Sequence, residues 1–365
     1  MPATPEPATA GSAAAPGEPA TGSQAARKLL ELLLERRDLS EGQAQELLAH
    51  LTNPEGTLAM SGAILAALRT KGVVAEELRG FARAMRRLAR RPHIPPNLRA
   101  IDVVGTGGDA SGSLNISTGT ALLTAACGIP VVKHGNRSVS SRAGSADVLE
   151  ALGLKIPLDE TEAGACLAAA NFTFLFAPYY HPAMKTVAPV RAALGVRTIF
   201  NILGPLTNPG TPPFHLIGAF SLEIAQLIAQ TLAGLEAERS FVVHGAEGWD
   251  EPTPVGAFTV FDVRPGHVEV RVRTPEDYGI ATCTALDLSG GDARHNAAAL
   301  RAVLTGEDRG PHRDCLLLGA ALALEVAGEA NDPREAVQRA ASAIDSGAGR
   351  RVLAALEGFS ATGQP

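Results

Sequence analysis

The chain has few of the residues that mark several common protein classes. Its four cysteines are spread over 365 residues without a Cys-x-x-Cys pair, which excludes a disulfide framework and zinc-ligand spacing. With one Trp, three Tyr and a net charge of −6, it lacks the basic surface and stacking aromatics of nucleic-acid-binding proteins. No apolar stretch is long enough to span a membrane. We therefore expect a soluble, cytoplasmic protein with reduced cysteines that binds neither nucleic acid nor membrane.

The first 24 residues lack any apolar period. They are dominated by Ala, Pro, Thr, Gly, Ser and Glu, with no basic start before a hydrophobic run. This composition predicts a disordered tail rather than a signal peptide. The whole chain exceeds the usual limit of a single hydrophobic core, which predicts a main domain and a smaller one.

Residues 25–96 carry the apolar spacing of short helices, and we expect them to form a small N-terminal helical domain, with which a helix near residues 181–195 would pack. Ser40 and Gln43 form a capping box for the second helix. A third helix ends at Gly72, and a fourth stops at Pro92. Helices this rich in Leu need a partner surface.

Residues 97–358 alternate strand-like apolar runs with helical segments. The runs lie at 101–104, 129–132, 174–176, 216–220 and 241–244. This alternation predicts a large α/β domain with a mostly parallel central sheet flanked by helices. Residues 256–272 read as two strands joined by a Pro-Gly turn. The chain then returns to helices, and residues 359–365 are expected to form a tail.

Three short polar segments follow or open these elements. They are GTGGD at 105–109, NIST at 115–118 and KHGNR at 133–137. The glycine turn can point backbone N–H groups at an anion without a Cβ in the way. The second segment lies at a helix N-terminus, where the helix dipole favours negative charge. Lys133 adds positive charge at the usual ligand edge of a parallel sheet, so the segments together predict a phosphate cradle.

Two common phosphate motifs do not fit this cradle, and a lone glycine cluster would read simply as a strand-to-helix connection. A nucleotide-triphosphatase loop needs Gly-Lys-Ser/Thr, but Asp109 follows Gly108. A dinucleotide fingerprint needs an acidic residue at the end of the next strand, where Lys133 and His134 stand instead. The pattern predicts a phosphate-rich ligand rather than NAD.

Further motifs make the chain similar to the anthranilate phosphoribosyltransferase family of tryptophan biosynthesis. Besides GTGGD and NIST these are KHGNRSVSS (133–141), GSAD (144–147), HPAMK (181–185), VRTIFNILGPLTNP (196–209) and DE (250–251). The resemblance spans residues 25–358 and implies a fold of the nucleoside phosphorylase-like phosphoribosyltransferases. It implies transfer of the phosphoribosyl group of phosphoribosyl pyrophosphate to the amine of anthranilate, giving N-(5-phosphoribosyl)anthranilate and pyrophosphate. It also implies a homodimer formed through the helical domain.

The resemblance implies a donor site residue by residue. The matching positions are Gly105, Gly108, Asp109, Ser113, Asn115, Ile116, Ser117, Thr118, Lys133, His134, Gly135, Asn136, Arg137, Ser140, Ser141 and Ser145. Because the departing pyrophosphate gains negative charge as the bond to ribose C1 breaks, such groups would stabilise it. The resemblance also implies two Mg²⁺ ions, held by Asp250, Glu251 and the hydroxyl of Ser117. Magnesium prefers a few carboxylates together with water and substrate phosphates, although an Asp-Glu pair without these motifs would read as a surface loop.

The acceptor side is also implied by the resemblance. The matching positions are Gly105, His134, Asn136, His181 and Arg191. A planar guanidinium at Arg191 suits the carboxylate of anthranilate, which Lys could not grip bidentately. Without the motif, Arg191 would read as a solvent-facing helix residue and the histidines as structural. No general base is assigned, because an aromatic amine is already neutral and nucleophilic at pH 7 and needs alignment and a dry site.

Four positions depart from the commonest family pattern. Arg142 and Ala143 stand where Lys and Ser are usual, and Trp249 and Pro252 flank the acidic pair where Leu and Ile often occur. These changes bear on the shape of the magnesium loop and on acceptor identity more than on reaction type. Two rival interpretations are a nucleoside phosphorylase or phosphoribosyltransferase that uses a nucleobase or another aromatic acceptor, and a non-catalytic sensor that kept the cradle. Mg²⁺-dependent turnover would exclude the sensor.

Overall fold

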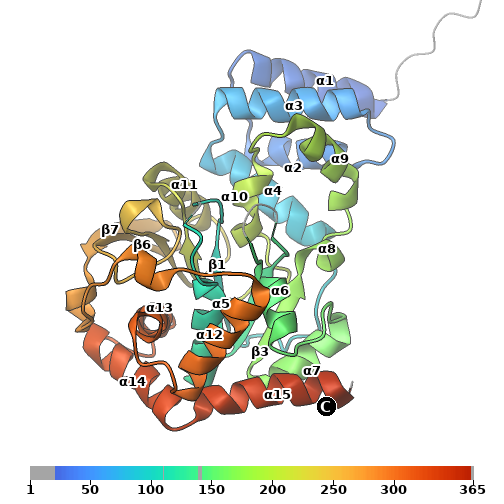
Figure 1. Ribbon diagram of the computed structural model, residues 1–365. Helices are drawn as coiled ribbons and strands as arrows, with labels where there is room; N and C mark the ends of the chain where they lie inside the picture. The colour runs from blue at the N-terminus through green and yellow to red at the C-terminus, as the bar shows by residue number, and fades with distance from the viewer. Residues whose placement is uncertain (1–20, 110, 139–141, 363–365) are drawn as a thin grey trace, which may run out of the picture.

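The computed structural model describes residues 21–109, 111–138 and 142–362. They form a small helical lobe above a larger α/β lobe that contains a seven-stranded sheet (Figure 1). Ser140 and Ser141, two of the predicted donor residues, lie outside the described residues, as do residues 1–20.

The N-terminal helices follow the predicted pattern. They are α1 (Thr21–Leu34), α2 (Glu41–Thr52), α3 (Leu58–Lys71) and α4 (Ala75–Leu88). The capping box is confirmed, because Ser40 Oγ accepts from the Gln43 N–H at 3.3 Å and the Gln43 side chain accepts from the Ser40 N–H at 2.9 Å. Gly72 ends α3 with a φ of 91°. The predicted tail boundary at residue 24 is wrong, since α1 already begins at Thr21.

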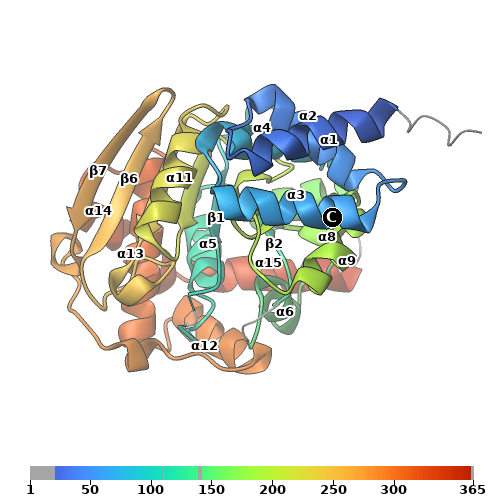
Figure 2. The ribbon, with the colours of Figure 1, turned by 90° about the horizontal axis from the view of Figure 1, so that it is seen from above.

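A fifth helix from later in the chain joins this lobe. Helix α9 (Met184–Leu194) packs against α2 and α3. Its Val187 and Val190 are buried in the same core as the leucines of α1 to α4. Figures 1 and 2 show α9 beside α3, although the two helices are far apart in the sequence. The helical lobe is thus assembled from two separate stretches of chain.

The sheet confirms the predicted α/β architecture. Its strands are β1 (Ile101–Gly105), β2 (Val131–Gly135), β3 (Phe172–Phe176), β4 (Phe214–Gly218), β5 (Arg239–His244), β6 (Phe258–Arg264) and β7 (His267–Arg273). They lie in the order β3-β2-β1-β4-β5-β6-β7, with β1 to β5 parallel and the β6–β7 hairpin antiparallel. The strand order reverses between β1 and β4. In open parallel sheets ligands bind at the carboxyl ends of strands beside such a reversal.

Two helical layers cover the sheet. The helices of the α/β lobe are α5 (Ile116–Ala126), α6 (Ser145–Ala151), α7 (Glu160–Ala170), α8 (Ala177–Tyr180), α10 (Phe200–Leu203), α11 (Leu222–Leu232), α12 (Ala293–Thr305), α13 (Pro311–Val326), α14 (Pro333–Asp345) and α15 (Ala348–Thr362). Successive strand residues face opposite layers. Leu216 belongs to the core that contains α5 and α13, whereas Ile217 belongs to the core that contains α11 and the helical lobe. One apolar core therefore continues from the sheet into the helical lobe.

The C-terminal boundary differs from the prediction. Helix α15 runs to Thr362, and Phe359, placed in a tail by the sequence, is only 7% exposed. The apolar spacing of Val352, Leu356 and Phe359 continues one face of the helix, which the match to the family motifs does not reveal.

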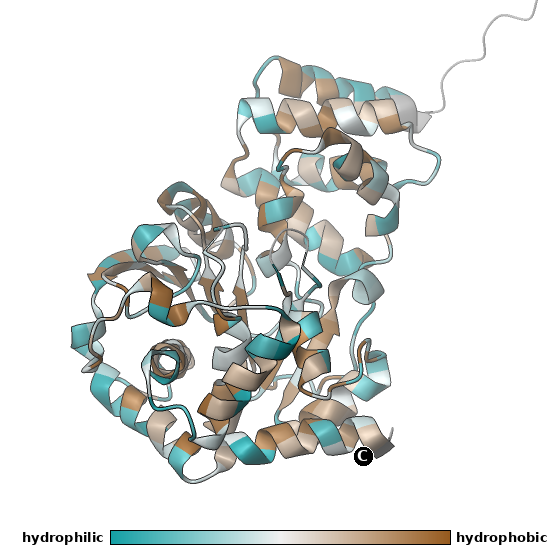
Figure 3. Cartoon of the chain, in the orientation of Figure 1, coloured by the Kyte–Doolittle hydropathy of each residue, from teal (hydrophilic) through white to brown (hydrophobic). Residues whose placement is uncertain are grey.

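The outer end of the helical lobe carries both polar and apolar residues. Figure 3 shows polar and apolar segments alternating along α1 and α3 at the far end of the helical lobe. Leu34 and Leu58, at 61% and 60% exposed, are among the apolar side chains open to solvent there. Among the described helices, none combines the length and apolarity that a bilayer crossing needs.

Deleting residues 1–20 should leave the melting temperature unchanged, because a segment of this composition buries too little apolar surface to offset its ordering entropy. Deleting residues 1–34 should lower it by several degrees, since α1 places Leu29 and Leu33 in the core. Scanning calorimetry of the two truncated chains checks this. Equal losses in both would assign residues 1–20 a structural role.

Candidate active site

The glycine turn after β1 has the backbone that the sequence predicts. Gly107 and Gly108 take φ values of 69° and 81°, a left-handed region that side chains rarely adopt. Gly105 is required for a different reason, since a Cβ there would overlap the Oδ2 atom of Asp250. The turn therefore brings bare backbone against the acidic loop.

The acidic pair lies directly on the phosphate cradle. Asp250 Oδ2 accepts from the Gly107 N–H at 2.5 Å, and Glu251 Oε1 accepts from the Ser117 N–H at 3.0 Å. Ser117 is in the first turn of α5. Two N–H groups expected to receive phosphate oxygens thus hold carboxylate oxygens, which stand where a ligand anion would bind.

Carboxyl groups outnumber cationic groups around the predicted phosphate cradle. Burial and the nearby Asp109 raise the pKa of Asp250 to about 7, and burial together with Asp250 raises that of Glu251 well above its ordinary value. Lys133, 1% exposed, donates from Nζ to Ser117 Oγ at 3.2 Å and to the Val103 carbonyl. Burial lowers the pKa of Lys133, while the surrounding carboxylates favour its charged form. One ammonium group faces several carboxyl groups.

Oxygen atoms dominate the possible metal ligands. Asp250, Glu251 and Ser117 offer two carboxylates and a hydroxyl, a set that suits Mg²⁺ rather than softer metals. Among the described residues no group of three or more His, Cys, Asp or Glu side chains is arranged to hold a metal ion. The set fits Mg²⁺ that takes its other ligands from water and substrate phosphate. A divalent cation would also offset the crowded negative charge.

The N-terminus of α5 is held from two sides. Asn115 donates from Nδ2 to the Ala143 carbonyl at 3.1 Å and accepts at Oδ1 from Asn296 Nδ2 at 2.8 Å. Asn296, on α12 and 2% exposed, is a residue that sequence reasoning missed. Thr118 is fully buried, and its Oγ1 has no partner among the residues that the structure describes. Asn115 therefore orients the helix start, as well as being a predicted donor residue.

A buried network supports the end of β2. Asp102 accepts at Oδ1 from the His134 N–H at 3.2 Å and at Oδ2 from Asn208 Nδ2 at 2.8 Å. Asn208 also donates to the Val132 carbonyl at 2.7 Å. Burial raises the pKa of Asp102 to about 6. Neither Asp102 nor Asn208 was predicted as a site residue. The available sequence signal was Asp102 itself, a single acidic residue within the apolar run of β1.

The segment after β2 turns toward α6. Ser145 Oγ donates to the Asn136 carbonyl at 3.2 Å, and a Cβ on Gly135 would overlap that hydroxyl. Arg137 forms ion pairs with Asp147 at 2.8 Å and Glu150 at 2.5 Å. Its guanidinium is therefore engaged on α6, and its part in donor binding stays a prediction. Ser113, also predicted there, accepts at Oγ from the Ser111 hydroxyl at 3.1 Å.

Two buried histidines form one wall near this edge. The rings of His134 and His181 meet edge to face with centroids 5.1 Å apart, and each residue is 4% exposed. His134 Nδ1 lies 3.3 Å from the Gly204 carbonyl. Burial lowers the pKa of His134 to about 3 and that of His181 to about 4. Both rings are neutral at pH 7 and cannot supply positive charge to a phosphoribosyl donor.

Burial of three histidines should lower stability as the pH falls below about 6.5, against an opposite contribution from Asp102, Asp250 and Glu251, whose pKa values are raised. His134, His181 and His215 all have pKa values lowered by burial, His215 to about 3. The unfolded chain binds the histidine protons first, so the stabilising contribution of each neutral ring is complete above pH 6.5 and falls by about 1.4 kcal/mol per pH unit as the pH decreases. Urea unfolding between pH 7.5 and 4.5 checks this. His215→Gln should change the slope of the free energy of unfolding against pH by about 1.4 kcal/mol per pH unit relative to the wild type, and the exposed His267→Gln should not. Equal slopes for the wild type and His215→Gln would contradict this assignment.

Arg191 lies on α9, as the sequence predicts. Its guanidinium stacks over the Phe200 ring at 5.5 Å, and burial lowers its pKa. Within the described part of the chain, no carboxylate pairs with it. A half-buried cation without a counter-ion suits a ligand carboxylate, the partner predicted for Arg191.

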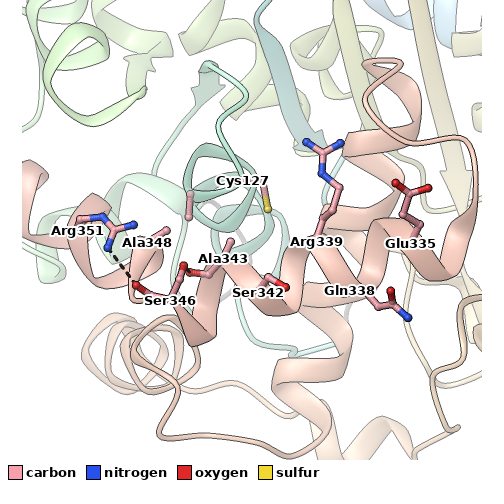
Figure 4. A pocket seen from close by; sticks show the side chains of 10 residues that line it. Cys127, Glu335, Gln338, Arg339, Ser342, Ala343, Ser346, Ala348 and Arg351 are labelled. Carbon is pink, nitrogen blue, oxygen red and sulfur yellow. Dashed lines mark hydrogen bonds between the residues drawn. The ribbon is translucent and has the colours of Figure 1, made fainter.

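A surface pocket of about 560 Å³ lies elsewhere, between the end of α5 and helices α14 and α15 (Figure 4). Its lining mixes Glu335, Arg339 and Arg351, and Arg351 donates to the Ser346 carbonyl at 3.1 Å. None of the predicted site residues lines this pocket. We assign it no part in the chemistry.

Comparison with known proteins agrees with this geometry. Residues 97–350 match the model described as "Glycosyl transferase family, a/b domain", and residues 27–89 match its "helical bundle domain". The anthranilate phosphoribosyltransferase of Desulforudis audaxviator is 46% identical over 334 residues, covering 91% of this chain and 96% of the relative. That of Methylobacterium nodulans is 47% identical, covering 86% and 93%.

Solved structures give the same result. Anthranilate phosphoribosyltransferase from Thermus thermophilus superimposes with a TM-score of 0.85 at 40% identity, covering 91% of this chain and 99% of its own. The Saccharomyces cerevisiae enzyme in complex with PRPP and Mg gives 0.84 at 25% identity, covering 93% and 98%. With its helical lobe, parallel sheet and polar strand ends, the chain belongs to the anthranilate phosphoribosyltransferase family.

Proposed function

We propose that this chain transfers the phosphoribosyl group of phosphoribosyl pyrophosphate to the amine of anthranilate, releasing pyrophosphate, in tryptophan biosynthesis. The observation that carries the proposal is a phosphate cradle with an acidic pair on it, in a fold that also holds a guanidinium without a counter-ion at Arg191. The relatives named above support it, and the yeast structure contains PRPP and Mg.

Donor binding rests on backbone N–H groups and one ammonium group. As the bond between ribose C1 and pyrophosphate breaks, positive charge develops on the sugar and negative charge on the leaving group. N–H groups of the glycine turn and of the start of α5 would hold the phosphate oxygens. Lys133 is fixed by its bonds to Ser117 and Val103, so it would not need to reorganise as charge builds up.

We assign the metal site to Asp250, Glu251 and the Ser117 hydroxyl, with two Mg²⁺ ions. Bound there, the metal supplies positive charge to the diphosphate oxygens. The two carboxylates would leave the N–H groups of Gly107 and Ser117 when they take up the metal, which frees both donors for phosphate. Metal binding at the carboxylates would therefore free the N–H groups that the donor phosphates use.

The acceptor would lie between the donor site and α9. Arg191 would grip the carboxylate of anthranilate, and Gly105 and Asn136 would complete the pocket. The neutral rings of His134 and His181 would pack against the aromatic ring and keep water out. We assign no general base, because the amine would attack in its neutral form.

We also propose a homodimer formed through the outer face of α1 and α3, and a cytoplasmic location. Leu34 is exposed at the end of α1 beside Ala63 and Ala66 of α3, Leu58 is exposed at the other end of α3, and exposed apolar side chains of this kind suit an interface. Sedimentation of Leu34→Glu together with Leu58→Glu tests the assembly. A wild-type chain that sediments as a monomer would refute it.

Pyrophosphate release tests the function. The chain is mixed with Mg²⁺ and phosphoribosyl pyrophosphate, and then with anthranilate, a pyrimidine or a purine in turn. Anthranilate should be the preferred acceptor, and release should stop in EDTA. Preference for a nucleobase would overturn the acceptor assignment but leave phosphoribosyl transfer intact, and absence of turnover with every acceptor would overturn the reaction.

A further inference from the structure

Arg197 lies in the connection between α9 and α10 and joins the two lobes at the glycine turn. Its guanidinium stacks over the Phe220 ring at 4.5 Å, and its Nη2 donates to the Gly108 carbonyl at 2.5 Å. Its own backbone carbonyl accepts from the guanidinium of Arg69, on α3 of the helical lobe. A chain of hydrogen bonds thus leads from α3 to the turn.

The turn is shaped around this guanidinium. A Cβ on Gly108 would overlap Arg197 Nη2, in addition to the cost of a φ of 81°. The Phe220 backbone N–H donates to Thr106 Oγ1 at 3.3 Å, so the residue whose ring lies under the guanidinium is hydrogen-bonded to the same turn. Arg197 therefore has both a fixed support and a fixed acceptor.

The bond to Gly108 decides which way a peptide group faces. In a planar trans peptide the C=O and the N–H point in opposite directions. With the Gly108 oxygen held by Arg197, the Asp109 N–H points away from the guanidinium. Because two successive glycines offer little resistance to rotation, this peptide could otherwise flip and turn a carbonyl oxygen toward the bound anion.

We propose that Arg197 is a positioning residue of the donor site: it fixes the Gly108–Asp109 peptide so that an N–H faces the donor phosphates, and it ties that orientation to the helical lobe through Arg69. The inference deepens the proposed function and rests on it for its kinetic consequence. Arg197 acts on the turn and does not touch the reacting atoms.

Steady-state kinetics of Arg197→Ala test the proposal. The KM for phosphoribosyl pyrophosphate should rise about tenfold, the worth of one charge-assisted hydrogen bond, while kcat and the KM for anthranilate change less than about threefold. Arg197→Lys keeps a hydrogen-bond donor but loses the planar stack on Phe220. Its KM for phosphoribosyl pyrophosphate should therefore lie between the values for the wild type and Arg197→Ala. Arg99→Ala is the matched control, since Arg99 stacks on Phe214 at 4.6 Å and pairs with Glu238 at the other end of β4.

The coupling to the helical lobe has its own test. Arg69→Ala should raise the donor KM in the wild-type background and add little in the Arg197→Ala background, because both changes loosen one connection. Full additivity would remove Arg69 from the proposal. A donor KM for Arg197→Ala within about twofold of that for Arg99→Ala, or a rise confined to the anthranilate KM, would overturn the positioning role.

Hydrogen exchange separates this inference from the proposed function. The Gly107 amide, bonded to Asp250, should exchange faster in Arg197→Ala than in Arg99→Ala, and this measurement needs no substrate. If the wild-type chain releases no pyrophosphate, the proposed function fails. Hydrogen exchange alone then tests whether Arg197 positions the turn. Faster exchange then supports the positioning of the turn, and equal exchange overturns it.

Discussion

Changing Asp250 to Asn and Glu251 to Gln together should lower kcat about a thousandfold, because a bound cation contributes several kcal/mol to a transition state that builds up charge on pyrophosphate. The amide oxygens can still accept from the Gly107 and Ser117 N–H groups, so the loop keeps its two anchors. Replacing crowded, buried carboxyl groups by neutral amides should leave the melting temperature equal or higher.

Trp249 makes binding visible in the same experiment. It is the single tryptophan of the chain, is 5% exposed and precedes the acidic pair. Its fluorescence should change when Mg²⁺ and pyrophosphate are added to the wild type and stay constant in the double variant. Glu276→Gln with Asp277→Asn, an exposed adjacent pair, is the control. Wild-type turnover by the double variant at limiting Mg²⁺ would remove the acidic pair from the mechanism.

Arg191→Ala should abolish most of the preference for anthranilate over aniline. The two acceptors differ only in the carboxylate, and removing one partner of a desolvated charge pair costs on the order of 2–5 kcal/mol. The KM for phosphoribosyl pyrophosphate should change little. Competition between the two amines, followed by pyrophosphate release, measures the effect.

Arg191→Lys separates charge from geometry at this position. If the planar guanidinium grips the carboxylate by two parallel bonds, Lys should recover only a small part of the preference. Full recovery would show that charge alone selects the acceptor. Equal use of anthranilate and aniline by the wild type would contradict a carboxylate site at Arg191 altogether.

The sequence predicted the elements well because their signals are local. Each parallel strand is a short apolar run, and the hairpin at β6 and β7 has its turn residues in place. The order of the strands is a long-range property, and no local pattern reveals that β1 lies between β2 and β4. The predicted boundaries at residues 24 and 358 were wrong, because composition and motif matches do not show where a helix begins or ends. Helix α1 begins before the first boundary and α15 continues beyond the second.

The candidate site divides in the same way. Glycine turns, a helix start and an acidic pair can be read from short motifs, whereas their partners come from distant parts of the chain. Asn296 is 181 residues from Asn115, and Arg197 is 89 residues from Gly108. Asp102 and Asn208 were missed because each supports other residues from inside the fold.

The carboxylates of Asp250 and Glu251 would compete with phosphate for the N–H groups of the proposed cradle. With phosphate bound as proposed, a free phosphate would have to displace Asp250 and Glu251 from the N–H groups of Gly107 and Ser117, so the intramolecular carboxylates would lower the affinity for phosphate compounds that arrive alone. In the proposed metal site, cation binding would draw these carboxylates away and remove the competition. By thermodynamic reciprocity, bound pyrophosphate must then raise the affinity for the cation by the same factor. The cradle would thus discriminate in favour of anions that arrive together with a divalent ion.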